Sequence, residues 1–225
     1  MSFTGIAGNH TLYINMNIRN IFFDLGGVLF NLNTRLSLRR FAELGMPIPD
    51  DILSNNAPFN ASPEGHPIFQ LIHKVDLGEI MGPEFLTVVR SQCREGVTDE
   101  QVLDAYNGLI DVPLHRLELL ERLRGQYRLF LVSNIGDLHW QAACEMAQAQ
   151  GYDLARLFER CFLSYEMHLA KPDPAYFQHA IRESGVNPDE TLYIDDSPAN
   201  IAVGREAGLQ TLLVEPNKLE EYLKI

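Results

Sequence analysis

Short, continuously apolar runs separated by amphipathic segments make up most of this chain. Four runs are rich in β-branched or aromatic residues, at 21–23, 129–132, 191–194 and 211–214, and a weaker run lies at 161–163. Apolar runs this short, without alternating polar residues, are typical of strands that are buried on both faces of a parallel sheet. The hydrophobic pattern therefore predicts a parallel β-sheet.

Helical patterns lie between these predicted strands. Residues 114–123 carry apolar positions at helical spacing, and Pro113 suits the start of a helix. Asp173-Pro174 is typical of an N-cap followed by a proline in the first turn, and Gly185 is placed to end that helix. Ser197-Pro198 repeats this arrangement. Strands that alternate with helices predict an α/β fold with a Rossmann-like core.

One stretch breaks the alternation. Between residues 32 and 112 we find no convincing strand, only helix-like segments at 35–44, 68–77, 83–90 and 99–109. This stretch is too long for an ordinary crossover between parallel strands, so we predict an inserted helical subdomain. The predicted boundaries are 17–31 and 113–225 for the α/β core and 32–112 for the insertion, with 1–16 as a flexible N-terminal extension.

Composition and charge narrow the possible functions. The 225 residues are 46% apolar and 21% charged, which is typical of a folded globular protein. A net charge of −12 argues against nucleic acid as a partner, and no apolar run is long enough to span a membrane. The three cysteines, Cys93, Cys144 and Cys161, form no CxxC motif, so we expect no zinc knuckle or disulfide framework and a cytoplasmic location.

Polar residues follow the predicted strands at the points where the strands end. They are Asp24, then Ser133-Asn134, then Lys171 ahead of the helix at Pro174, and then Asp195-Asp196-Ser197. The carboxyl ends of parallel strands meet at one edge of the sheet, where ligands bind in α/β proteins. Each feature also has a simple structural interpretation: a turn at Asp24, helix capping at Ser133-Asn134 and Asp195-Asp196-Ser197, or a solvated lysine.

The combination of these residues favours a functional site. Carboxylates brought together at strand ends repel one another, so their protonation must shift or a cation must neutralise them. Oxygen ligands without nearby His or Cys favour Mg²⁺, which commonly binds one or two carboxylates, water and a phosphate oxygen. Lys171 and the backbone N–H groups after Ser133 would attract such a phosphate. The sequence therefore predicts a magnesium and phosphate site.

These motifs, in this order, resemble those of the haloacid dehalogenase (HAD) superfamily. The matching segments are FDLGGVL at 23–29, LVSN at 131–134, KPD at 171–173 and IDDSPANI at 194–201. The insertion falls where that family places a helical cap. Within the superfamily, the first motif and the cap segment LGEI at 77–80 are most similar to α-D-glucose-1-phosphate phosphatases and to the phosphatase domain of soluble epoxide hydrolases.

The resemblance implies a mechanism and a role for each residue. Asp24 would attack phosphorus and form an aspartyl-phosphate, which water then hydrolyses. Magnesium would be held by Asp24, the backbone carbonyl of Gly26 and Asp196, with Asp195 acting directly or through water. The phosphoryl oxygens would be bound by Ser133, Asn134 and Lys171, and Asn200 would position the loop or Lys171. The expected ligand is a small phosphorylated metabolite; monomer and dimer stay open.

One position departs from the family pattern. Most phosphatases of this family carry a second aspartate two residues after the nucleophile, as the general acid, and here that residue is Gly26. Its loss would cost on the order of 10²–10⁴ in rate unless water, His66, His73 or an easily released leaving group compensates. A weakly catalytic module that binds a phosphorylated ligand is therefore an alternative. A dehalogenase is a further alternative, against which Asp195-Asp196 argues.

Overall fold

The computed structural model describes residues 17–49, 52–53 and 67–223, so the predicted extension at 1–16 lies outside the described residues. Five parallel strands form one sheet in the order β5-β4-β1-β6-β7. The strands are β1 Asn20–Phe23, β4 Arg128–Ser133, β5 Arg160–Leu163, β6 Thr191–Asp195 and β7 Gln210–Leu213. The predicted parallel sheet is confirmed, including its weaker run at 161–163.

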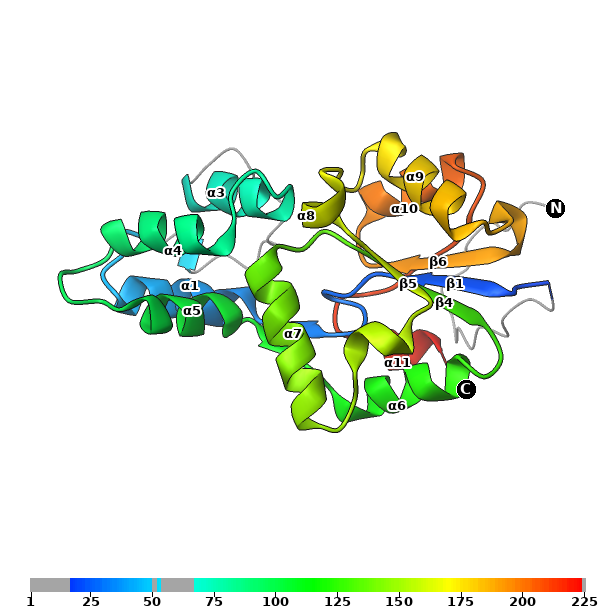
Figure 1. Ribbon diagram of the computed structural model, residues 1–225, viewed down its shortest axis with the longest axis horizontal. Helices are drawn as coiled ribbons and strands as arrows, with labels where there is room; N and C mark the ends of the chain where they lie inside the picture. Colours follow the sequence, from blue (N-terminus) through cyan, green and yellow to red (C-terminus); the bar gives the residue numbers. More distant parts are fainter. Residues whose placement is uncertain (1–16, 50–51, 54–66, 224–225) are drawn as a thin grey trace.

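The central strand is buried on both faces, as its continuous apolar run predicts. Ile21 and Phe23 pack into one hydrophobic cluster, whereas Phe22 packs into another on the opposite face of the sheet. The first face is covered by helices α6 Leu114–Leu123, α7 Asp137–Ala149 and α11 Leu219–Tyr222 (Figure 1). The second is covered by α9 Pro174–Ser184 and α10 Pro198–Glu206. These layers leave the carboxyl ends of the strands open for a site.

The capping residues predicted for two helices, α9 and α10, are confirmed. The Asp173 side chain accepts a hydrogen bond from the backbone N–H of Ala175 (2.8 Å), and Gly185 ends α9 in the left-handed conformation. Ser197 is the N-cap of α10. Helix α7 is not predicted by the sequence pattern, because its buried residues are alanines that give little hydrophobic contrast. No helix among the described residues has the length and apolarity that crossing a bilayer would require.

The helical segments between β1 and β4 share a hydrophobic cluster of their own. They are α1 Thr34–Glu43, α3 Pro67–Asp76, α4 Gly82–Ser91 and α5 Asp99–Asn107. Phe41, Ile72, Phe85 and Tyr106 are among its buried members, and the ring centroids of Phe85 and Tyr106 lie 4.4 Å apart. Figure 1 shows these helices, which we call the cap helices, at one end of the molecule beyond the sheet. The exact domain boundaries stay a prediction.

A small antiparallel ribbon corrects the expectation that residues 32–112 contain no strand. Strand β2, Asn31–Leu32, pairs with β3, Ile110–Asp111, at the two ends of the inserted segment. Two-residue strands give no periodic signal, and the pairing joins residues far apart in the sequence. The remaining short elements are the 3₁₀ helices η2 Leu154–Leu157 and η3 Pro188–Glu190 and helix α8 Ser164–Met167.

Candidate functional site

Asp24 lies at the carboxyl end of the central strand. Its backbone N–H donates to the carbonyl of Ile194 (3.0 Å), which continues the pairing of β1 with β6 by one residue. The side chain is buried, and its Oδ1 accepts a hydrogen bond from the N–H of Leu25 (2.8 Å). The strand therefore fixes this carboxylate at the edge of the sheet rather than leaving it in a solvated turn.

Lys171 is buried and paired, so the interpretation as a solvated lysine is wrong. Its side chain is 1% exposed, and Nζ lies 3.0 Å from Asp24 Oδ1 and 2.7 Å from Asp195 Oδ2. Nζ also donates to the carbonyl of Val132 (2.8 Å). An ammonium group held between two carboxylates and a carbonyl has all three of its hydrogens in use.

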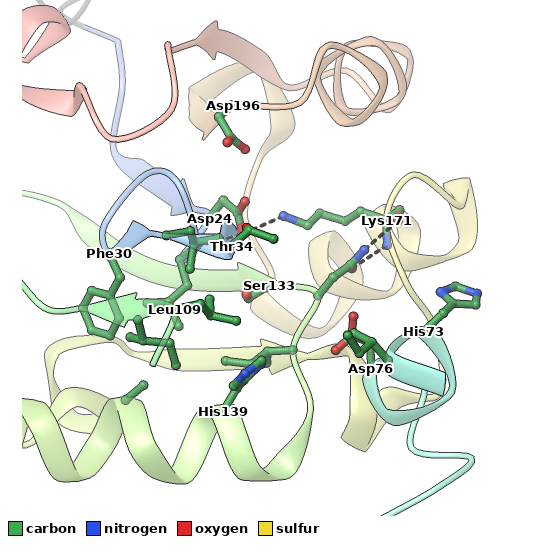
Figure 2. Close-up of a pocket in the computed structure, with 18 of the residues that line it drawn as sticks. Asp24, Phe30, Thr34, His73, Asp76, Leu109, Ser133, His139, Lys171 and Asp196 are labelled. Atoms are coloured by element: carbon green, nitrogen blue, oxygen red, sulfur yellow. Dashed lines mark hydrogen bonds and ion pairs between the residues drawn. The ribbon is translucent and has the colours of Figure 1, made fainter. Parts of the chain in front are cut away.

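The Asn134 side chain holds the backbone of Lys171. Asn134 Oδ1 accepts the N–H of Lys171, and Nδ2 donates to the carbonyl of Lys171, both at 2.8 Å (Figure 2). The predicted residues Asn134 and Lys171 therefore meet. The Asn134 side-chain amide therefore uses both its oxygen and its nitrogen to position Lys171. Neighbouring Ser133 is buried. The N-cap of α7 is Gly136, so Ser133-Asn134 does not cap this helix.

Asp195 is fully buried within a shell of donors. Besides Lys171, it accepts hydrogen bonds from the N–H of Ser197 (2.8 Å), from the Asn200 amide (3.1 and 3.2 Å) and from the Tyr193 hydroxyl. Asn200 therefore contacts Asp195 rather than Lys171 itself. A carboxylate with both oxygens occupied in this way is suited to orienting Lys171.

Three carboxylates converge beside the lysine. Oxygen atoms of Asp24, Asp195 and Asp196 all lie within 4.8 Å of one another. Burial, together with the neighbouring carboxylates and against the effect of Lys171, raises the pKa of Asp24 to about 7. Burial and Asp195 likewise raise the pKa of Asp196 to about 6. Excess negative charge and hard oxygen donors fit a divalent cation such as Mg²⁺.

Lys171 carries a charge despite its burial. Burial alone lowers the pKa of a lysine, but Asp195 and Asp24 outweigh it, so the pKa of Lys171 is raised. The ammonium therefore stays protonated and offsets part of the negative charge of the cluster.

Two glycines shape the loop after Asp24. Gly27 has a φ of +79°, and a Cβ at this position would lie 2.2 Å from Asp196 Oδ2. A Cβ on Gly26 would lie 2.7 Å from Leu32 Cδ1. The absence of a side chain at Gly27 therefore makes room for the carboxylate of Asp196. At Gly26, the Leu32 side chain occupies the space into which a side chain would project.

A cavity of about 430 Å³ opens above this cluster. Asp24, Ser133, Lys171 and Asp196 line one side, and residues of the cap helices line the other (Figure 2). Of the proton donors considered from the sequence, His73 is exposed at the cavity rim and His66 lies outside the described residues.

Two cavity residues are missed by the sequence reasoning. His139 of α7 stacks on Tyr106 with ring centroids 3.7 Å apart, and burial lowers the pKa of His139 to about 4. Asp76, the last residue of α3, also lines the cavity, and burial raises its pKa to about 7. Neither residue lies at a strand end, so the rule that located the other residues could not find them.

Comparisons with known proteins show which family this chain matches. Residues 18–208 match the family described as haloacid dehalogenase-like hydrolase. The chain is 30% identical over 200 residues to the D-ribitol-5-phosphate phosphatase of Bacteroides thetaiotaomicron, covering 88% of this chain and 92% of that protein. It is 28% identical to (S)-2-haloacid dehalogenase 4A of Burkholderia cepacia over 122 residues, 54% of this chain and 50% of that protein.

A solved structure is also similar over nearly its whole length. The HAD family enzyme BT-2542 of Bacteroides thetaiotaomicron, in complex with magnesium and inorganic phosphate, has a TM-score of 0.77 and 30% identity, with 89% of this chain and 96% of that chain covered. The family matches this chain over residues 18–208, which is most of its length. The chain belongs to the haloacid dehalogenase-like hydrolase family.

Proposed function

We propose that this chain is a Mg²⁺-dependent phosphatase that hydrolyses a small phosphomonoester through an aspartyl-phosphate intermediate. The observation that carries the proposal is the cluster of Asp24, Asp195 and Asp196 beside the buried ammonium of Lys171. A site that attracts both a divalent cation and a phosphate is suited to phosphoryl transfer. The similarity to a D-ribitol-5-phosphate phosphatase supports a polyol or sugar phosphate as the substrate class.

Each residue near the strand ends has its own role in the proposed reaction. Asp24 attacks phosphorus in line and forms the acyl phosphate, and water then releases inorganic phosphate and restores the carboxylate. Lys171 neutralises charge that develops on the phosphoryl oxygens, and the Ser133 hydroxyl and the backbone N–H of Asn134 bind them. The Lys171 side chain is buried and paired with Asp24, so this positive charge is in place before the substrate arrives.

Asp24, the backbone carbonyl of Gly26 and Asp196 would hold the magnesium ion. The bound ion would screen the nucleophile from the negative charge of the phosphate. We assign Asp195 to positioning Lys171, with any contribution to the metal through water, because both of its oxygens already accept hydrogen bonds.

A panel of phosphate esters tests the proposal. We expect saturable release of inorganic phosphate from polyol and sugar phosphates, D-ribitol 5-phosphate among them, in the presence of Mg²⁺ and loss of release in EDTA. Chloride release from 2-chloropropionate that survives EDTA would instead support the dehalogenase. Saturable binding without turnover of any ester would support the weakly catalytic binding module.

A single methyl group at Gly27 tests the metal site. The Gly27→Ala variant places a Cβ against the Asp196 carboxylate, so we expect Mg²⁺ affinity to fall on the order of 10–100-fold, measured by calorimetric titration. The matched control is Gly96→Ala. Gly96 has a φ of +86°, but no atom lies within 4 Å of its added Cβ.

Both variants carry the strain of a left-handed residue, on the order of 1–3 kcal/mol. Only Gly27→Ala crowds Asp196, so only this variant is expected to lose the metal. Equal Mg²⁺ affinity in the two variants would contradict the assignment of Asp196 as a ligand.

A further inference from the structure

We propose that Asp76, at the end of a cap helix, is the general acid and base of this phosphatase. This inference rests on the proposed function. It addresses the departure at Gly26, where most phosphatases of the family carry their proton-donating aspartate.

The usual place for the acid is filled by another side chain. A Cβ on Gly26 would lie 2.7 Å from Cδ1 and 3.4 Å from Cγ of Leu32, in the first strand of the ribbon. A side chain at residue 26 would therefore require the outer atoms of the Leu32 side chain to move. Gly26 itself carries no carboxyl group, so the proton donor must be another residue of the cavity.

Asp76 provides a carboxyl group from the opposite wall. It lines the same cavity as Asp24, Ser133 and Lys171. Figure 2 shows it projecting from α3 toward the cavity, across from Ser133, whereas His73 of the same helix lies at the edge of the view. In-line attack by Asp24 places the leaving oxygen on the side of phosphorus away from the nucleophile, which is the side of the cap helices.

The structure gives Asp76 no stabilising partner. Its carboxyl group makes no hydrogen bond or ion pair with any of the described residues. As the last residue of α3, it places a negative charge at the helix end where the macrodipole disfavours one. Departures from a local stability rule of this kind commonly mark functional sites.

The surroundings of Asp76 suit proton transfer. Tyr106 of α5 and Asp137 and His139 of α7 are titratable groups of this region, and the Tyr106 hydroxyl has no hydrogen-bond partner among the described residues. Burial keeps His139 neutral near neutral pH. The exposed His73 and the buried Lys171 line the same cavity, but Lys171 is paired with Asp24 and Asp195. Burial raises the pKa of Asp76 to about 7, so it can both give and take a proton near neutral pH.

Asp76 would exchange one proton in each of the two steps. As Asp24 forms its bond to phosphorus and the ester P–O bond breaks, the Asp76 carboxyl gives its proton to the leaving alkoxide, which departs as an alcohol. The resulting Asp76 carboxylate then takes a proton from the water that attacks the aspartyl-phosphate. The bond between Asp24 and phosphorus breaks, inorganic phosphate leaves, and both residues regain their starting states.

The test compares leaving groups in the Asp76→Asn variant. With a polyol phosphate and Mg²⁺, we expect kcat to fall on the order of 10²–10⁴-fold. With p-nitrophenyl phosphate the leaving group needs no proton, so the first step stays fast while the second is slow. Rapid mixing is then expected to show a burst that approaches one nitrophenolate per site. The matched control, Glu79→Gln, removes an exposed carboxylate three residues away and is expected to behave like the wild type.

A rescue variant separates proton transfer from a structural role. Adding Gly26→Asp with Leu32→Ala to Asp76→Asn restores a carboxyl at the usual position and frees the space for it. We expect hydrolysis of the polyol phosphate to recover at least tenfold. If Asp76→Asn does not fold, Asp76→Ser is used for the same comparisons.

Three outcomes are distinguishable. A burst with p-nitrophenyl phosphate together with rescue supports the proposal. Turnover of the polyol phosphate within threefold of wild type, or an equal loss on both substrates without a burst, overturns the role of Asp76 and leaves the phosphatase function intact. Absence of Mg²⁺-dependent turnover of any ester by the wild type overturns the proposed function itself.

Discussion

Replacing Asp24 by asparagine is expected to reduce turnover of every phosphate ester by at least about 10⁴-fold, because the variant has no nucleophile to form the aspartyl-phosphate. The measurement is release of inorganic phosphate under saturating Mg²⁺. The matched control is Asp189→Asn, which removes an exposed carboxylate in η3, ahead of the amino end of β6. Turnover by Asp24→Asn within tenfold of the wild type would contradict the assignment of the nucleophile.

The same variant is expected to be at least as stable as the wild type when metal is absent. The folded state raises the pKa of Asp24 from 3.8 to about 7, so it binds this proton more tightly than the unfolded chain does. That stabilisation is complete at low pH and is lost as the pH rises through about 7. Thermal unfolding at pH 8 in EDTA is therefore expected to give a Tm for Asp24→Asn equal to or above that of the wild type. A clearly lower Tm would show that the carboxylate also stabilises the fold.

Replacing Lys171 by methionine is expected to abolish activity and to destabilise the fold. The change leaves the carboxylates of Asp24 and Asp195 buried without their shared cation. Removing one partner of a buried ion pair typically costs about 3–5 kcal/mol. Urea unfolding at pH 8 in EDTA measures the loss. The loss is expected to be smaller at pH 5, where Asp24 can bind a proton.

A second substitution identifies the cause of this loss. Lys171→Met with Asp195→Asn removes the unpaired charge as well as the ammonium, so we expect much of the stability to return while activity stays absent. A double variant as unstable as Lys171→Met alone would mean that packing, rather than uncompensated charge, determines the cost. The two measurements together separate the catalytic contribution of Lys171 from its structural contribution.

The local signals in the sequence predicted the core of the fold well. Continuous apolar runs located all five strands of the sheet, and capping residues located the ends of α9 and α10. Such signals act within a few residues and do not depend on the rest of the chain. The pattern failed for α7, whose buried face is formed by small residues, and for the ribbon of β2 and β3, which only a long-range pairing creates.

The candidate site was predicted where it follows strand ends. Asp24, Ser133 and Asp195 end or follow parallel strands, so topology alone brings them together. The hydrogen-bond partners of the individual side chains within the site could not be predicted in this way. Asn134 holds the backbone of Lys171, and the Asn200 amide donates a hydrogen bond to Asp195. Both contacts depend on side-chain directions, which are set by the packing of several elements against one another.

The sequence by itself thus determined a parallel α/β core, an inserted group of helices and a set of carboxylates and one lysine at the sheet edge, because continuous apolar runs, local capping residues and the polar residues that follow the strands mark them. Only the tertiary structure decided that Leu32 fills the space beside Gly26 and that Asp76 enters the cavity from a cap helix. Both features arise from contacts between segments far apart in the chain, and no local pattern of residues records which of those segments meet.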